Sequence, residues 1–100
     1  MAALRHAPTM DDLRAKREEI LQAAYARGVF NIRVYGSVAR GDAGPESDID
    51  LIVDIESDRS LFDLIGFQLD LEEFLDHPVG VTTRVDALIR RRVEAQAVPL

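Results

Sequence analysis

The sequence predicts an α/β or α+β sandwich in which helices pack against a small mixed sheet. Three observations support this prediction. Apolar residues recur at helical spacing over residues 9–28 and 61–75. Apolar and polar residues alternate, as in strands, over residues 30–34 and 48–55. Glycine, proline or short polar loops separate these segments, so that strands and helices alternate along the chain.

Length and composition are typical of one small globular domain. A chain of 100 residues with 47% hydrophobic content can bury a modest core, so we expect a single domain over residues 1–100, with residues 1–8 as a frayed start. No apolar run approaches the ~20 residues that span a membrane, and no signal peptide is evident. The lack of cysteine excludes disulfides and thiolate metal sites and is compatible with the cytoplasmic location that we expect.

The first predicted helix and strand occupy the N-terminal third of the chain. Thr9 can cap the helix and Gly28 can close it. The strand that follows carries Phe30, Ile32 and Val34 on one face and leads directly into a Gly-Ser turn.

The second predicted strand follows a loop at residues 43–46 and has one apolar and one acidic face. We expect the apolar face to pack on helices and the acidic face to open toward a substrate. The apolar face holds Ile49, Leu51, Val53 and Ile55, and the other face holds Asp48, Asp50, Ile52 and Asp54.

The remaining elements are a helix, a strand and a last helix. Ser60 can cap the helix over residues 61–75, and Pro78 marks its end. Residues 79–85 form the predicted third strand, and residues 87–97 form the last helix. Two histidines, His6 and His77, are expected to be exposed in a tail and a loop, and Arg90, Arg91 and Arg92 to lie on a solvated face.

A glycine-serine turn precedes a pair of carboxylates. Gly36 lets the backbone turn tightly and approach a phosphate, and Ser37 adds a hydroxyl donor. If a short helix starts at this turn, its free N–H groups also point at an anion. Asp48 and Asp50 stand two positions apart, so on a strand they project from one face, roughly 6–7 Å apart. Such hard oxygen ligands suit Mg²⁺ bound together with nucleotide phosphates.

The pattern Gly-Ser-x10-Asp-x-Asp, within the string GSVARGDAGPESDIDLIV, resembles the minimal nucleotidyltransferases of the polymerase-β superfamily. The resemblance covers nearly the whole chain and implies the polymerase-β-like nucleotidyltransferase fold. It implies that Gly36 and Ser37 hold the phosphates of ATP and that Asp48 and Asp50 hold Mg²⁺. Arg40 matches the basic residue of the family's turn and is expected near a phosphate.

The chain departs from that family at the third carboxylate, which helps to hold a second metal and to activate the attacking hydroxyl. Aligned without gaps, Gly80 occupies its position, and glycine can perform neither role. Asp76 and Asp86 are candidate substitutes, one before and one beyond the predicted strand. The sequence therefore leaves open whether the chain is an active enzyme.

The resemblance implies three functions. In the first, the chain is an antitoxin that transfers AMP from Mg-ATP to a tyrosine of a partner HEPN-domain toxin. In the second, it is a catalytically impaired module that neutralises the toxin by binding alone. The third is nucleotidyl transfer to a small molecule, which is less favoured because such relatives carry a further domain for the acceptor.

The net charge of −6 indicates which class of macromolecule the chain binds. It argues against general binding of nucleic acid, because phosphate contacts need a basic surface. It is compatible with an acidic module that covers a basic protein. We therefore expect a hetero-oligomer with the toxin, and no direct contact with nucleic acid or membrane.

Overall fold

The computed structural model describes residues 6–83 and 97–100. Residues 1–5 of the predicted frayed start lie outside the described part of the chain, as do three further sequence predictions. These are the end of the third strand at residues 84–85, Asp86 as a substitute carboxylate, and the last helix with Arg90, Arg91 and Arg92.

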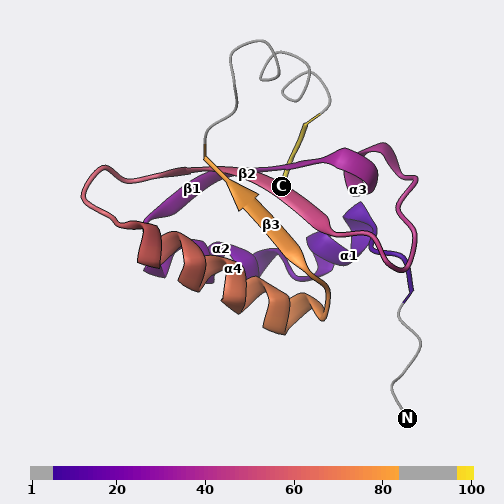
Figure 1. Ribbon diagram of the computed structural model, residues 1–100, viewed down its shortest axis with the longest axis horizontal. Helices are drawn as coiled ribbons and strands as arrows, with labels where there is room; N and C mark the ends of the chain where they lie inside the picture. Colours follow the sequence, from indigo (N-terminus) through magenta and orange to yellow (C-terminus); the bar gives the residue numbers. More distant parts are fainter. Residues whose placement is uncertain (1–5, 84–96) are drawn as a thin grey trace.

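Four strands of the described residues form one mixed sheet in the order β3-β2-β1-β4 (Figure 1). The central strand β1 (Val29–Tyr35) is antiparallel to β2 (Ile49–Ile55) and to β4 (Val98–Pro99). The edge strand β3 (Val79–Thr82) runs parallel to β2. The prediction of a small mixed sheet is therefore confirmed.

The helices α1 (Met10–Ala15), α2 (Arg17–Ala26) and α4 (Leu61–Leu75) lie along one side of the sheet, whereas the short helix α3 (Gly36–Arg40) lies at one end (Figure 1). One hydrophobic core fills the space between the sheet and these helices. Its fully buried large side chains come from both layers and are Leu13, Ile20, Val34, Val38, Ile49, Leu51, Val53, Phe67 and Leu71.

The N-terminal helical segment is two helices, and the prediction of one continuous helix is wrong at Lys16. Its N-terminus is as expected, since the backbone N–H of Asp12 donates to Thr9 Oγ1 (3.1 Å) and that of Thr9 donates to Asp12 Oδ2 (3.0 Å). At Lys16 the backbone N–H bonds to the carbonyl of Leu13, three residues back, at 3.1 Å. This tighter turn ends α1, and α2 begins at the next residue.

A β-bulge in β1 changes which residue faces the core. Asn31 has φ 52°, and the pairing register with β2 shifts between Phe30 and Arg33. Because one extra residue reverses the alternation, Val29 is buried and Phe30 is 51% exposed. The prediction that Phe30 shares the buried face of Ile32 is therefore wrong.

The C-terminal half contains one predicted helix with correct bounds, one predicted strand and one unpredicted strand. The predicted strand β3 is shorter than expected, because it ends at Thr82 and Thr83 lies in a bend. Helix α4 begins after Ser60 and ends at Leu75, as expected, and Asp76 terminates it in the left-handed conformation (φ 51°). The strand β4 was not predicted, because two residues that include a proline carry too little alternation to be recognised. None of the described helices has the length and apolar character needed to cross a membrane.

Candidate functional site

Three residues from three strands stand in one row across the sheet. Tyr35 in β1 pairs with Asp50 in β2, and Asp50 pairs with Gly80 in β3. Their chain neighbours Ile49 and Val79 are buried in the core. Because alternate residues of a strand point to opposite faces, the row lies on the face away from the helical layer.

The glycine-serine turn lies directly against this row. Strand β1 ends at Tyr35, and α3 begins at Gly36, which has φ 74°. A Cβ atom built on Gly36 would lie 2.8 Å from Asp50 Oδ2, closer than real Cβ contacts allow. Glycine is therefore required here for its backbone conformation and for the close approach of a carboxylate.

The turn is closed by a second glycine. Gly41 caps α3 in the left-handed conformation (φ 82°), and the Ser37 carbonyl accepts from the backbone N–H groups of Gly41 (2.9 Å) and Asp42 (3.0 Å). Arg40 lies in the last turn of α3, half exposed, with its Nε 3.3 Å from Asp42 Oδ2. The structure thus gives Arg40 an acidic neighbour at the surface of the turn.

The two candidate metal ligands differ in burial. Asp48 is exposed at the end of the loop before β2, whereas Asp50 is partly buried. Burial, followed by the negative charge of Asp48, raises the pKa of Asp50 above its usual range. Burial and the charge of Asp50 likewise raise the pKa of the Tyr35 hydroxyl. A bound cation would favour the charged form of Asp50, which burial and the charge of Asp48 both disfavour.

The donor set fits Mg²⁺ bound together with a nucleotide. In the part of the chain that the structure describes, no group of three His, Cys, Asp or Glu side chains could hold a metal ion. Mg²⁺ is commonly bound by one or two carboxylates with substrate phosphates and water completing its shell. Asp48 and Asp50 offer such a pair, and the turn at Gly36 lies directly against the Asp50 carboxylate.

The sequence prediction sets Gly80 at the position of the family's third carboxylate, and the structure gives its neighbours. Gly80 is the residue of β3 that pairs with Asp50, so a side chain there would point at the Asp50 carboxylate. A Cβ atom on Gly80 would lie 3.2 Å from Asp50 Oδ1. Asp76 is exposed at the end of α4, before β3 begins, and so does not belong to the row.

Two further residues of the sheet bear on the sequence predictions. Tyr35 was not singled out, although the pairing of β1 with β2 places it next to Asp50. Asp54 lies near the end of β2 with a side chain that is 41% exposed, as expected, and it also accepts from Asn31 Nδ2 (2.9 Å) and pairs with Arg33 Nη2 (3.3 Å). Asp54 therefore has a structural role beside the bulge.

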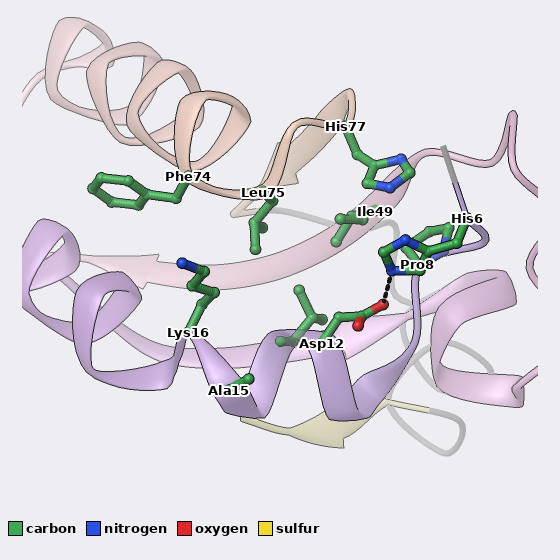
Figure 2. Close-up of a pocket in the computed structure, with 10 residues that line it drawn as sticks. His6, Pro8, Asp12, Ala15, Lys16, Ile49, Phe74, Leu75 and His77 are labelled. Atoms are coloured by element: carbon green, nitrogen blue, oxygen red, sulfur yellow. Dashed lines mark hydrogen bonds and ion pairs between the residues drawn. The ribbon is translucent and has the colours of Figure 1, made fainter. Parts of the chain in front are cut away.

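A pocket of about 200 Å³ lies elsewhere, between α1, the end of α4 and the start of β2 (Figure 2). His77 lines it and is buried, so the prediction that His77 is exposed is wrong. Its ring packs edge-on against that of His6, with centroids 6.3 Å apart, and His6 Nε2 lies 3.0 Å from Asp12 Oδ2. None of the candidate nucleotide or metal residues lines this pocket.

Comparison with known protein families gives a match to the nucleotidyltransferase domain over residues 14–96. Two curated relatives come from Methanocaldococcus jannaschii and Thermococcus cleftensis. The first is provisionally named protein adenylyltransferase MJ0435 and is 32% identical over 82% of this chain and 90% of the relative. The second, protein adenylyltransferase MntA, is 38% identical over 68% of this chain and 63% of the relative.

Two solved structures share the fold. One, provisionally described as a minimal nucleotidyltransferase, is 37% identical, with a TM-score of 0.83 over 92% of this chain and 96% of that one. The other is a crystal structure of a toxin-antitoxin with AMP-PNP. It matches with a TM-score of 0.69 over 82% of this chain and 69% of that one, and at 19% identity this likeness concerns the fold alone.

Proposed function

The chain belongs to the nucleotidyltransferase domain family, and from this membership we propose that it is an antitoxin that adenylylates a partner toxin. AMP passes from Mg-ATP to a tyrosine hydroxyl of a HEPN-domain toxin, and pyrophosphate leaves. The observation that carries the proposal is the contact of the Gly36 turn with the Asp50 carboxylate, which joins a phosphate cradle to a metal ligand. The relatives named as protein adenylyltransferases support the same class of reaction.

Each site residue has a proposed part in the transfer. The backbone at Gly36 and the hydroxyl of Ser37 bind the phosphates, and Arg40 adds a positive charge at the end of the same short helix. Asp48 and Asp50 hold Mg²⁺, which when bound neutralises charge that develops on the phosphates. ATP and Mg²⁺ are both available in the cytoplasm, where we place the protein.

The second candidate function, neutralisation by binding alone, is favoured by Gly80. A missing metal ligand or base costs on the order of 10²–10⁴ in rate, the scale that general-base catalysis contributes. An antitoxin that modifies each toxin molecule once tolerates such a loss, whereas a metabolic enzyme does not. Both candidate functions therefore require a complex with the toxin, and only adenylylation modifies the toxin covalently.

The intact mass of the toxin tests this proposal. A HEPN-domain toxin from the same organism is incubated with the full chain, ATP and Mg²⁺, and its intact mass is then measured by mass spectrometry. The matched control is the double variant Asp48→Asn/Asp50→Asn, which keeps the side-chain size and removes the charge. A mass gain of one or more adenylyl groups that appears with the native chain and not with the double variant supports adenylylation.

Other outcomes separate the alternatives. No mass gain together with a stable complex that blocks the toxin favours binding alone. A mass gain that is equal in the double variant contradicts the assignment of Asp48 and Asp50. In a calorimetric titration the double variant should also lose Mg²⁺-dependent binding of ATP, and unchanged binding would count against the site.

A further inference from the structure

Helix α4 carries an apolar stripe on the side that faces away from the sheet. Leu61, Phe62, Ile65 and Leu69 are 68%, 80%, 43% and 58% exposed, and we call these four residues the α4 stripe. Leu61, Ile65 and Leu69 repeat every four residues, so they form one ridge along the helix, with Phe62 beside it. The opposite side of the same helix is buried through Phe67 and Leu71.

The exposed area of the stripe is large for a chain of this size. Four large apolar side chains with this exposure present on the order of 500 Å², which is the scale of apolar patches that mark interaction sites. A stable interface covers about 800 Å² on each partner, so the stripe can supply its apolar centre and leave room for a polar rim. A ridge of i, i+4 residues is the surface against which another helix packs.

The rim of the stripe carries both charges, because two carboxylates of α4 have arginine partners from outside the helix. Helix α4 contains four carboxylates and no lysine or arginine. Asp63 and Asp70 are paired with Arg59 (3.8 Å) and Arg27 (3.5 Å), and Glu72 accepts the backbone N–H of Val79 (3.1 Å). Glu73 is exposed and has no ion pair with a described residue. It lies in the last turn, where the negative end of the helix dipole makes a carboxylate unfavourable.

We propose that the α4 stripe docks an amphipathic helix of a partner protein, with an apolar face and basic flanks. Such a helix would cover the stripe and place a positive charge beside Glu73 and the C-terminus of α4. A second copy of this chain fits less well, because each copy has a net charge of −6 and two acidic helices would face each other.

This inference deepens the proposed function and rests on it only for the identity of the partner. The α4 stripe lies on the helical side of the sheet, whereas Asp50 faces the other side. Docking at the stripe would therefore hold a toxin without covering the transfer site. Affinity for the partner would then be independent of Asp48 and Asp50.

Peptide binding tests the chemistry of the docked helix directly. The probe is a fluorescent 20-residue peptide with leucine at helical i, i+4 spacing and lysine on both flanks, and a matched peptide carries glutamate in place of lysine. Binding to the full chain is measured by fluorescence anisotropy without ATP. Neither peptide contains tyrosine, so a failure of adenylylation leaves this test unaffected.

The variants define the expected result. Phe62→Ala/Leu69→Ala should weaken binding of the lysine peptide at least tenfold, and Glu73→Lys should weaken it several-fold. The matched controls are Tyr25→Ala, an exposed aromatic residue on α2, and Glu18→Lys, an exposed carboxylate on α2. Both controls should bind as the native chain does. Because every altered side chain is exposed, the melting temperatures should stay close to the native value.

Three results would overturn the proposal. One is that the lysine peptide fails to bind, or binds the double alanine variant as tightly as the native chain. Another is equal affinity for the two peptides, since the charge of Glu73 would then have no role. The third is a dimer of the native chain, detected by sedimentation and lost in Phe62→Ala/Leu69→Ala, because a second copy would then be the occupant.

Discussion

Gly80 lies directly opposite Asp50 in the parallel pairing of β2 and β3, and a Cβ atom at Gly80 would come within 3.2 Å of Asp50 Oδ1. This distance is short, and the Asp50 side chain would have to move by a few tenths of an ångström to make room for the Cβ atom. Glycine at position 80 thus leaves space for the Asp50 side chain and offers no side chain that could bind a metal. Four predictions follow from this and related contacts.

The first prediction concerns Gly80→Asp. We expect the new carboxylate to point at Asp50 and to increase the rate of adenylyl transfer, within the 10²–10⁴-fold scale of a lost base or ligand. Gly80→Ala is the matched control, because it adds the same Cβ without the charge, and it should not increase the rate. If folded Gly80→Asp is no faster than Gly80→Ala, the assignment of Gly80 to the third carboxylate position is wrong.

The second prediction compares Gly36→Ala with Gly41→Ala. Both glycines have positive φ, so each alanine costs about 1–2 kcal/mol of unfolding free energy. At Gly41 nothing lies within 4 Å of the added Cβ, whereas at Gly36 it meets Asp50 Oδ2 at 2.8 Å. Gly36→Ala should therefore be the less stable variant and should also lose ATP binding. Urea titration and calorimetry measure the two effects, and equal losses would contradict the contact.

The third prediction concerns the bulge at Asn31. Asn31→Val should lower the unfolding free energy by on the order of 1–3 kcal/mol, because a β-branched residue is strained at φ 52° and loses the hydrogen bond to Asp54. Asn31→Gly loses the same hydrogen bond without the strain and should be the more stable of the two. Urea unfolding provides the comparison. A more stable valine variant would mean that the strand pairs without the bulge.

The fourth prediction concerns Asp12 and pH. Although burial opposes the change, hydrogen bonds from Thr9 and His6 lower the pKa of Asp12 below 3.8. A lowered folded-state pKa gives stability that is present above pH 3.8 and lost as the pH falls through the folded-state value. Asp12→Asn should therefore lower the melting temperature near neutral pH and converge with the native chain in acid.

The control for this pH effect is Asp11→Asn, since Asp11 lies on the same turn, is almost fully exposed and pairs with Arg14 at 3.6 Å. It should change the melting temperature less than Asp12→Asn does, because surface ion pairs contribute little. Thermal unfolding followed by circular dichroism between about pH 2 and pH 7 resolves the difference. A constant offset across this range would show that the charge of Asp12 has no part in the cap.

Much of the local structure could be predicted from sequence because it depends on neighbouring residues. The bounds of α4 follow from the Ser60 cap, the apolar spacing and Pro78 beyond its end. The strand that carries Asp50 and the turn at Ser37 follow equally from local pattern, whereas the helical form of that turn was not predicted. The motif and its spacing likewise identified the family, since they are properties of the linear chain.

The tertiary structure alone decided which distant residues meet. Register across strands sets Tyr35, Asp50 and Gly80 in one row, and no local periodicity encodes that pairing. The bulge reversed the face of Phe30, and His77 is buried beside the His6 ring in the pocket between α1 and the end of α4. The periodicity of a segment shows which of its faces is apolar and which is polar. Which other segment that face packs against is decided only when the whole chain folds around one core.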